Sequence, residues 1–114
     1  MSDAKSPALA NFERMLASGR DGALLRFSLG NEYLKAGDAA RAVEHFGRAI
    51  AIDRHYTAAW KLYAKSLAAA GRADDAIQAY RDGIAVARKK GDRQAEKEMQ
   101  VFVRRLEAAR GDRA

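Results

Sequence analysis

A 34-residue period constrains this chain more than any other feature of its sequence. Ala8, Ala42 and Ala76 follow one another at intervals of 34 residues, and an aromatic side chain stands four residues after each. Those aromatics are Phe12, Phe46 and Tyr80, and the sets Leu9/Val43/Ile77, Leu16/Ile50/Ile84 and Arg20/Arg54/Arg88 keep the same interval. Such a period is typical of stacked helical hairpins, because one hairpin cannot bury its apolar face without a neighbour. The sequence therefore predicts an all-α fold, an α-solenoid of antiparallel helix hairpins with about six helices.

Length and composition fit one domain over residues 1–114. Hydrophobic residues make up 48% of the chain and charged residues 32%, with a single proline. This composition excludes disordered and collagen-like classes. A chain of this size can bury roughly 60 to 70% of its unfolded surface, so a real core is expected.

Helix start and stop signals divide the chain. Ser6 before Pro7 predicts a capped first helix over about 7–18. Gly37 and Asp38 predict a turn between antiparallel helices over about 22–36 and 39–52. Residues 57–90 repeat this hairpin, with Gly71 at the turn.

The last predicted helix, over about 93–109, breaks the period. Glu98 stands where Gly30 and Ala64 stood in the two hairpins, and the face that would meet a further hairpin is charged. The apolar side chains of this helix share one face: Ala95, Met99, Phe102, Val103 and Leu106. We therefore expect a terminal capping helix, followed by a frayed tail over 111–114.

Three motifs carry a resemblance to a known family. Leu29-Gly30-x-x-Tyr33, Ala42-x-x-x-Phe46-x-x-Ala49 and Trp60-x-x-Tyr63-Ala64 resemble the tetratricopeptide repeat (TPR), as found in small bacterial proteins of that family. The resemblance implies a half-repeat helix at 7–18, repeats at 23–56 and 57–90, and a capping helix at 92–109, forming a right-handed superhelix. Arg26 replaces the family's tryptophan, Gly83 replaces an alanine, and Arg54 and Arg88 occupy a proline position. These departures are expected to weaken single repeats but not the period.

Catalytic chemistry is not indicated. The chain has no cysteine, which excludes disulfides, thiolate nucleophiles and sulfur-ligated metals. Its two histidines, His45 and His55, lie ten residues apart without a metal-ligand spacing, and each is interpreted as a surface side chain. No glycine-rich phosphate loop or nucleophile elbow is present. We predict neither an enzyme nor a cofactor or metal site.

The predicted binding surface is the concave side of the stack, lined by the outgoing helix of each hairpin. By register with the family, the resemblance implies a peptide-binding groove made by Leu24, Phe27, Asn31, Leu34, Ala58, Lys61, Lys65, Ala68 and, on the last helix, Asp92, Ala95 and Met99. Apolar contact at Phe27, an amide at Asn31 and two ammonium groups suit an acidic or C-terminal peptide. The alternative is that Lys61 and Lys65 are a solvated pair and that Phe27 is partly buried against Leu24 or the first helix. The family's two-carboxylate clamp is matched only by Asn31, which disfavours chaperone tails as partners.

These features favour a cytoplasmic adaptor that binds a protein or peptide. The alternative is a homo-oligomeric scaffold, such as a homodimer joined through an exposed end of the stack. Net charge is +6 and the basic residues are spread along the chain, which favours a solvated, mildly basic surface. Electrostatic binding of nucleic acid is a weaker alternative, because no exposed aromatics are expected among its cations, Arg88, Lys89, Lys90, Arg93, Arg104 and Arg105. No stretch approaches the ~20 apolar residues of a membrane span.

Overall fold

A computed structural model describes residues 6–111, and this part of the chain forms six α-helices and no β-strand. The helices are α1 (Pro7–Ala17), α2 (Ala23–Lys35), α3 (Ala39–Ile52), α4 (Thr57–Ala69), α5 (Ala73–Lys90) and α6 (Arg93–Arg110). The predicted all-α fold is confirmed. Most of the predicted tail, residues 112–114, lies outside the described residues.

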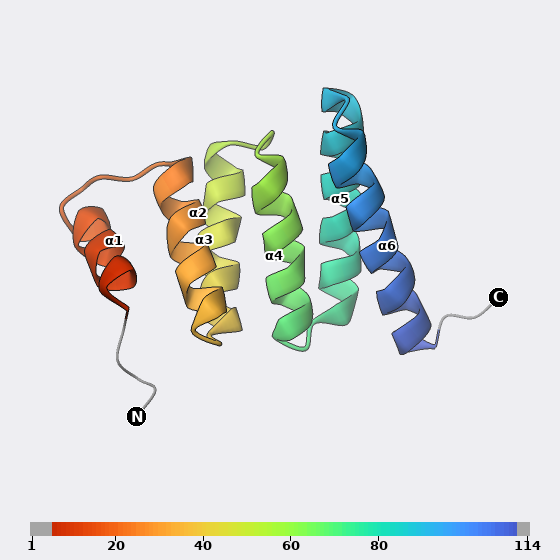
Figure 1. Ribbon diagram of the computed structural model, residues 1–114, viewed down its shortest axis with the longest axis horizontal. Coiled ribbons are helices and arrows are strands. Elements are labelled where there is room, and N and C mark those ends of the chain that lie inside the picture. The colour runs from red at the N-terminus through yellow and green to blue at the C-terminus, as the bar shows by residue number, and fades with distance from the viewer. Residues whose placement is uncertain (1–5, 112–114) are drawn as a thin grey trace.

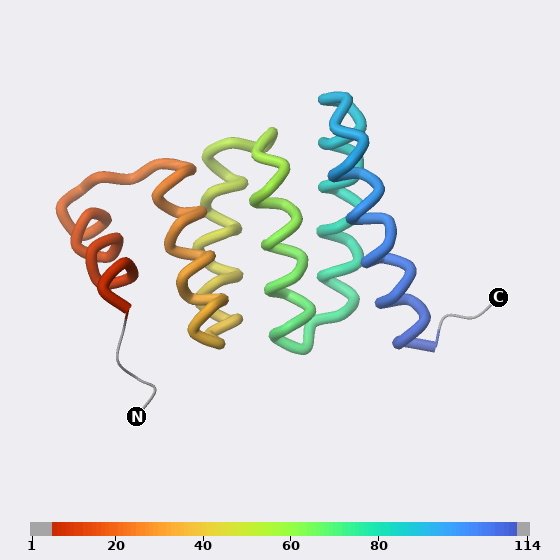
Figure 2. The backbone as a smooth tube through the Cα atoms, in the orientation of Figure 1, coloured from red at the N-terminus to blue at the C-terminus, as the bar shows by residue number. Residues whose placement is uncertain are grey.

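The helices stand side by side in chain order, with α1 at one end and α6 at the other (Figure 1). The backbone reverses direction at each connection from α2 to α6, so neighbours along the chain are neighbours in space (Figure 2). The molecule measures 49 × 35 × 19 Å along its principal axes. Its thickness is that of about two helices, each ~10 Å across, so the stack has two layers.

Helix ends follow the predicted capping signals. The Ser6 hydroxyl accepts a hydrogen bond from the Leu9 amide at 3.0 Å, and an Asp38 carboxylate oxygen accepts from the Arg41 amide at 3.1 Å. Gly37 has a φ of 83°, a left-handed conformation that residues with a Cβ rarely adopt. The turn from α2 into α3 therefore forms where the sequence predicts it.

Small residues of the period allow the helices to approach closely. Ala42, Ala64 and Ala76 are fully buried. Gly30 lies against the ring of Phe46, and a Cβ added at Gly30 would lie only 2.7 Å from a ring carbon. The period therefore reflects small residues on one helix that pack against large side chains on the next.

Two departures from the repeat pattern have a packing role in the structure. A Cβ on Gly83 would lie 2.8 Å from Met99 Sδ and 2.9 Å from Trp60 Cβ, so the missing side chain admits both neighbours. The Arg54 carbonyl accepts a hydrogen bond from Trp60 Nε1 at 2.9 Å, and the Arg54 guanidinium lies 5.6 Å from the Trp60 ring centroid. These contacts tie the second repeat to its neighbours.

The two layers of the stack are not equally close. Helix α4 contacts both α2 and α6, whereas α3 and α5 do not contact each other within residues 6–111. The layer of α2, α4 and α6 is therefore the more closely spaced one, and we call it the inner layer and its outer surface the inner face.

Candidate functional site

All of the predicted groove residues except Met99 are at least partly exposed. On α2, Leu24 is 70% exposed, the larger of the two values among exposed large hydrophobic side chains in the described chain. Asn31 and Leu34 are half-buried further along the same helix. On α4, Ala58 and Lys65 are exposed. The inner face thus presents a solvent-exposed leucine near the start of α2 and continues onto α4.

Phe27 serves mainly as a packing residue. Its ring stacks on Tyr56 with centroids 4.9 Å apart and meets Phe46 edge-on at 5.6 Å. This matches the alternative of partial burial, although the partners come from α3 and the α3–α4 connection instead of Leu24 or α1. Because the ring joins two clusters of buried side chains, only one side of it can face a ligand.

Lys61 is held by an ion pair that the sequence did not reveal. Its Nζ donates to Glu98 Oε1 at 3.0 Å, which links α4 to α6 across 37 residues of sequence. The hydrogen bond from Lys61, helped by one from Gln94, lowers the pKa of Glu98. The pair lies in a cleft of about 260 Å³ on the inner face, lined by Thr57, Ala58, Lys61, Asp92, Gln94, Ala95 and Glu98. This end of the inner face therefore presents charges of both signs.

The assignment of Met99 to the groove was wrong. Its side chain is 0% exposed and packs in the cluster that holds Tyr80 and Val103. The space left by Gly83 receives the Met99 sulfur. On α6 the residues that reach the inner-face cleft are instead Asp92, Gln94, Ala95 and Glu98. Of these, Asp92 and Ala95 belonged to the predicted row.

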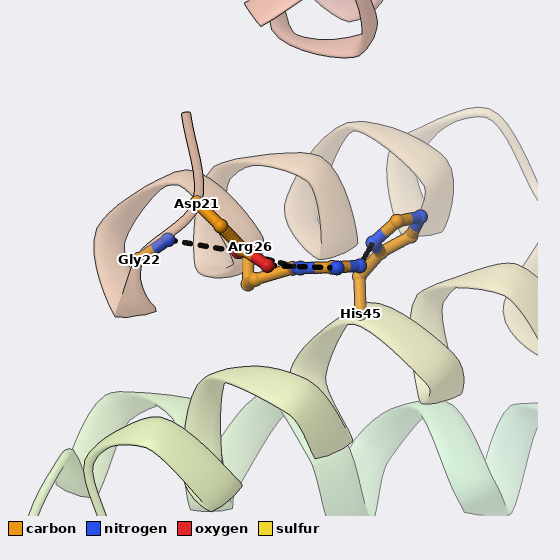
Figure 3. A network of polar contacts seen from close by, with 4 residues as sticks. All are labelled: Asp21, Gly22, Arg26 and His45. Atoms are coloured by element: carbon orange, nitrogen blue, oxygen red, sulfur yellow. Dashed lines mark hydrogen bonds and ion pairs between the residues drawn. The ribbon is translucent and has the colours of Figure 1, made fainter. Parts of the chain in front are cut away.

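A second polar cluster joins the start of α2 to α3 (Figure 3). The Arg26 guanidinium donates from Nε to Asp21 Oδ1 at 2.9 Å and from Nη2 to Oδ2 at 3.1 Å. Its Nη1 lies 3.2 Å from His45 Nδ1, and the Gly22 amide donates to Asp21 Oδ1 at 2.8 Å. Arg26 thus replaces the family's buried aromatic ring by a hydrogen-bonded anchor, and the hydrogen bond from Arg26 lowers the pKa of Asp21.

The expectation that His45 is a surface side chain was wrong, whereas His55 is exposed. The His45 ring is half-buried and stacks on Tyr33 with ring centroids 5.3 Å apart and planes 3° apart. Since a guanidinium has only donors, His45 Nδ1 must accept the hydrogen bond from Arg26, which places the ring proton on Nε2. Burial of the ring, and then the Arg26 charge, lower the pKa of His45. The cluster therefore anchors α2 to α3 through a neutral histidine, and none of its side chains is a nucleophile.

Within residues 6–111, no group of three or more histidines, aspartates and glutamates is arranged to hold a metal ion. No helix of the described chain has the length and apolar character needed to cross a bilayer.

Fold and inner face together define an α-helical repeat protein, and comparison with known proteins narrows the class. A family model described as tetratricopeptide repeat matches residues 33–96. A TPR repeat-containing protein of Pseudomonas aeruginosa is 53% identical over 102 residues, covering 90% of this chain and 97% of the relative. The chain belongs to the tetratricopeptide repeat family.

Solved structures agree with this assignment. The solution structure of a Bordetella parapertussis protein matches with a TM-score of 0.80 and 41% identity, over 94% of this chain and 91% of that one. The solution structure of a tetratricopeptide repeat domain protein from Salinibacter ruber matches with a TM-score of 0.71 and 31% identity, over 77% and 89% of the two chains. Proteins of this family generally mediate protein–protein interaction and are typically non-enzymatic scaffolds.

Proposed function

We propose that this protein is an adaptor that binds a peptide or helix of another protein on its inner face. The observation that carries the proposal is the inner layer itself, where α2, α4 and α6 are close together and Leu24 stands 70% exposed. A face of closely spaced, rigid helices can accept a partner helix or an extended segment, and an exposed leucine on it offers an apolar anchor contact. The cytoplasmic location stays a prediction from the sequence.

The chemistry of the inner face indicates the kind of segment it accepts. Leu24 offers an apolar contact at one end, and Lys65 offers an ammonium group that no ion pair within residues 6–111 engages. At the other end, Lys61 already holds Glu98, so an acidic residue of the partner must compete with this carboxylate. An acidic peptide with an apolar anchor, placed with its anchor at Leu24 and its acid at Lys65, meets both conditions.

The experiment starts with peptides selected from a displayed random library on the wild-type protein. A selected peptide, labelled with fluorescein, is then titrated by fluorescence anisotropy against Leu24→Glu and Lys65→Glu. Both side chains are exposed, so neither change disturbs the core. The matched control is Ile52→Glu, which puts the same charge in place of a 50% exposed side chain on the outer-layer helix α3. Phe27→Ala is a poorer choice because it removes core contacts.

We expect the two inner-face variants to lose at least tenfold in affinity, about 1.4 kcal/mol, while the control stays near the wild type. Equal loss in the control would place the binding surface elsewhere. The homo-oligomeric alternative is decided by sedimentation at several concentrations. A second copy on the inner face would give a concentration-dependent mass that Leu24→Glu abolishes.

A further inference from the structure

The outward side of α6 carries a row of basic residues. Arg93, Lys97, Gln100 and Arg104 follow one another at intervals of four, three and four residues, so they share one face of the helix. Arg93, Lys97 and Arg104 are exposed. The buried side of the same helix presents Met99 and Val103 to the core. Helix α6 stands at the end of the stack (Figure 1). By helical spacing, the row lies on the side of α6 opposite its buried Met99 and Val103.

Ion pairs neutralise three of the cations on α5 and α6. Arg81 pairs with Glu107, Arg88 with Glu96 and Arg110 with Asp74. No ion pair within residues 6–111 engages Arg93, Lys97 or Arg104. Their charges are consequently available to a ligand.

A cleft adjoins the row where α5 ends and α6 begins. It has a volume of about 420 Å³ and is lined by Arg88, Gly91, Arg93, Glu96, Lys97 and Gln100. The Arg88 guanidinium binds the Glu96 carboxylate, with Nη2 2.7 Å from Oε2. Glu96 is thereby compensated, and Arg93 and Lys97 remain as the uncompensated charges of the cleft. We call Arg88, Arg93, Lys97, Gln100 and Arg104 the basic face.

We propose that the basic face is a second docking surface, and that its partner is an acidic segment of a protein with carboxylates at helical spacing. The cations recur about once per helical turn of ~5.4 Å, which matches aspartates or glutamates spaced by three and four residues on a partner helix. The Gln100 amide donates one N–H to Glu96 Oε2 at 3.4 Å and has a second N–H for one of these carboxylates. This surface is separate from the inner face, because Glu98 on α6 points to Lys61 of α4.

The same residues overlap those considered for nucleic acid, but the structure favours a protein partner. A nucleic-acid strand presents a uniform row of phosphates, whereas the cleft lining alternates cations with the Arg88-paired carboxylate of Glu96. None of the basic-face residues is aromatic, so bases would find no stacking platform there. A protein partner can instead leave a neutral or basic side chain opposite Glu96.

Binding to a defined acidic probe tests the proposal. The probe is a fluorescein-labelled, alanine-based helical peptide whose glutamates repeat at intervals of three and four residues, and the comparison ligand is an oligothymidylate of the same charge. Both are titrated against the wild type and against the triple variant Arg93→Gln, Lys97→Gln, Arg104→Gln. The matched control is Arg14→Gln, Arg20→Gln, Arg48→Gln, which removes three exposed cations far from α6. Each triple variant loses three charges from a net charge of +6, so overall charge cancels from the comparison.

We expect the peptide to bind the wild type, to bind less well as salt rises, and to lose about tenfold in affinity in the basic-face variant. The control variant should keep its affinity within about twofold, since exposed charges further than a Debye length away are largely screened. Equal losses in the two triple variants would show that affinity depends only on net charge, which would overturn the proposal. Tighter binding of the oligothymidylate than of the peptide would overturn it in favour of nucleic acid. Circular dichroism of each variant verifies that the helices remain.

Discussion

Two glycines in helices allow the effect of helix propensity on stability to be measured separately from the effect of side-chain packing. Replacing glycine by alanine inside a helix stabilises it by about 1 kcal/mol when space is available. Gly47 meets this condition, because its added Cβ would lie 3.5 Å from Tyr63 Cε1, an ordinary van der Waals distance. We therefore expect Gly47→Ala to stabilise the fold.

Gly30→Ala should do the opposite. Its added Cβ would lie 2.7, 2.8 and 2.9 Å from three carbons of the Phe46 ring. That ring is fully buried and holds Phe27 edge-on, so it cannot swing away without disturbing a second aromatic contact. Overpacking of this kind costs about 1 to 3 kcal/mol. The helix preference gained is the same in both variants, so the difference between them isolates that cost.

Thermal and urea unfolding of both variants, followed by circular dichroism at 222 nm, measure the difference. For a domain of this size, about 1 kcal/mol corresponds to a melting-temperature change of ~4 °C or somewhat more. We expect Gly47→Ala to melt above the wild type and Gly30→Ala to melt below Gly47→Ala by roughly 4 to 15 °C. Equal shifts of the same sign would refute the idea that Gly30 is required by the Phe46 contact. Restoration of stability in Gly30→Ala by a simultaneous Phe46→Leu change would locate the clash at that ring.

Further outcomes follow from Trp60 and His45. Trp60→Ala removes a ring only 5% exposed and should lower the free energy of unfolding by about 3 to 5 kcal/mol in urea titrations, whereas an unchanged midpoint would mean that Trp60 does not anchor α4. Trp60→Phe should cost less, about 1 kcal/mol beyond the lost area, because it leaves the Arg54 carbonyl without its 2.9 Å donor. Burial lowers the pKa of His45 in the folded state, against the opposing charges of Glu44, Glu13 and Asp21, so the unfolded chain binds this proton more readily. Stability should be fully present above about pH 6.5 and fall as the pH drops below it, and His45→Gln should flatten this part of the stability profile; an unchanged profile would contradict the anchor role of His45.

Local signals in the sequence predicted the helices well. The predicted helix over 39–52 has the bounds observed for α3, because Asp38 caps its first turn and the apolar stripe ends at Ile52. The period likewise predicted the stacking, since Gly30, Ala42 and Phe46 meet in the core. These features depend on residues that lie within one repeat, so their spacing can be read directly from the sequence.

The site was harder to predict because it depends on how helices are rotated against one another. From the sequence, Met99 could belong to the core, because it is apolar, or to the groove, because of its register. The space beside Gly83 places its side chain in the core. The ion pair between Lys61 and Glu98 joins residues 37 apart and depends on the rotation of α6. His45 could not be assigned either, because Arg26 replaces an aromatic ring and draws the imidazole into a hydrogen bond. The basic row on α6, in contrast, was detectable from its spacing alone.

Helix α1 contacts α2 and no other helix of the described chain. Detachment of this terminal unit would break one helix contact, whereas removal of α4 would break four. In a linear array, such an end dissociates at a lower free energy than the interior. Native-state hydrogen exchange should therefore find the amides of α1 least protected, and the Leu29 and Tyr33 side chains beneath it would be uncovered whenever the end opens.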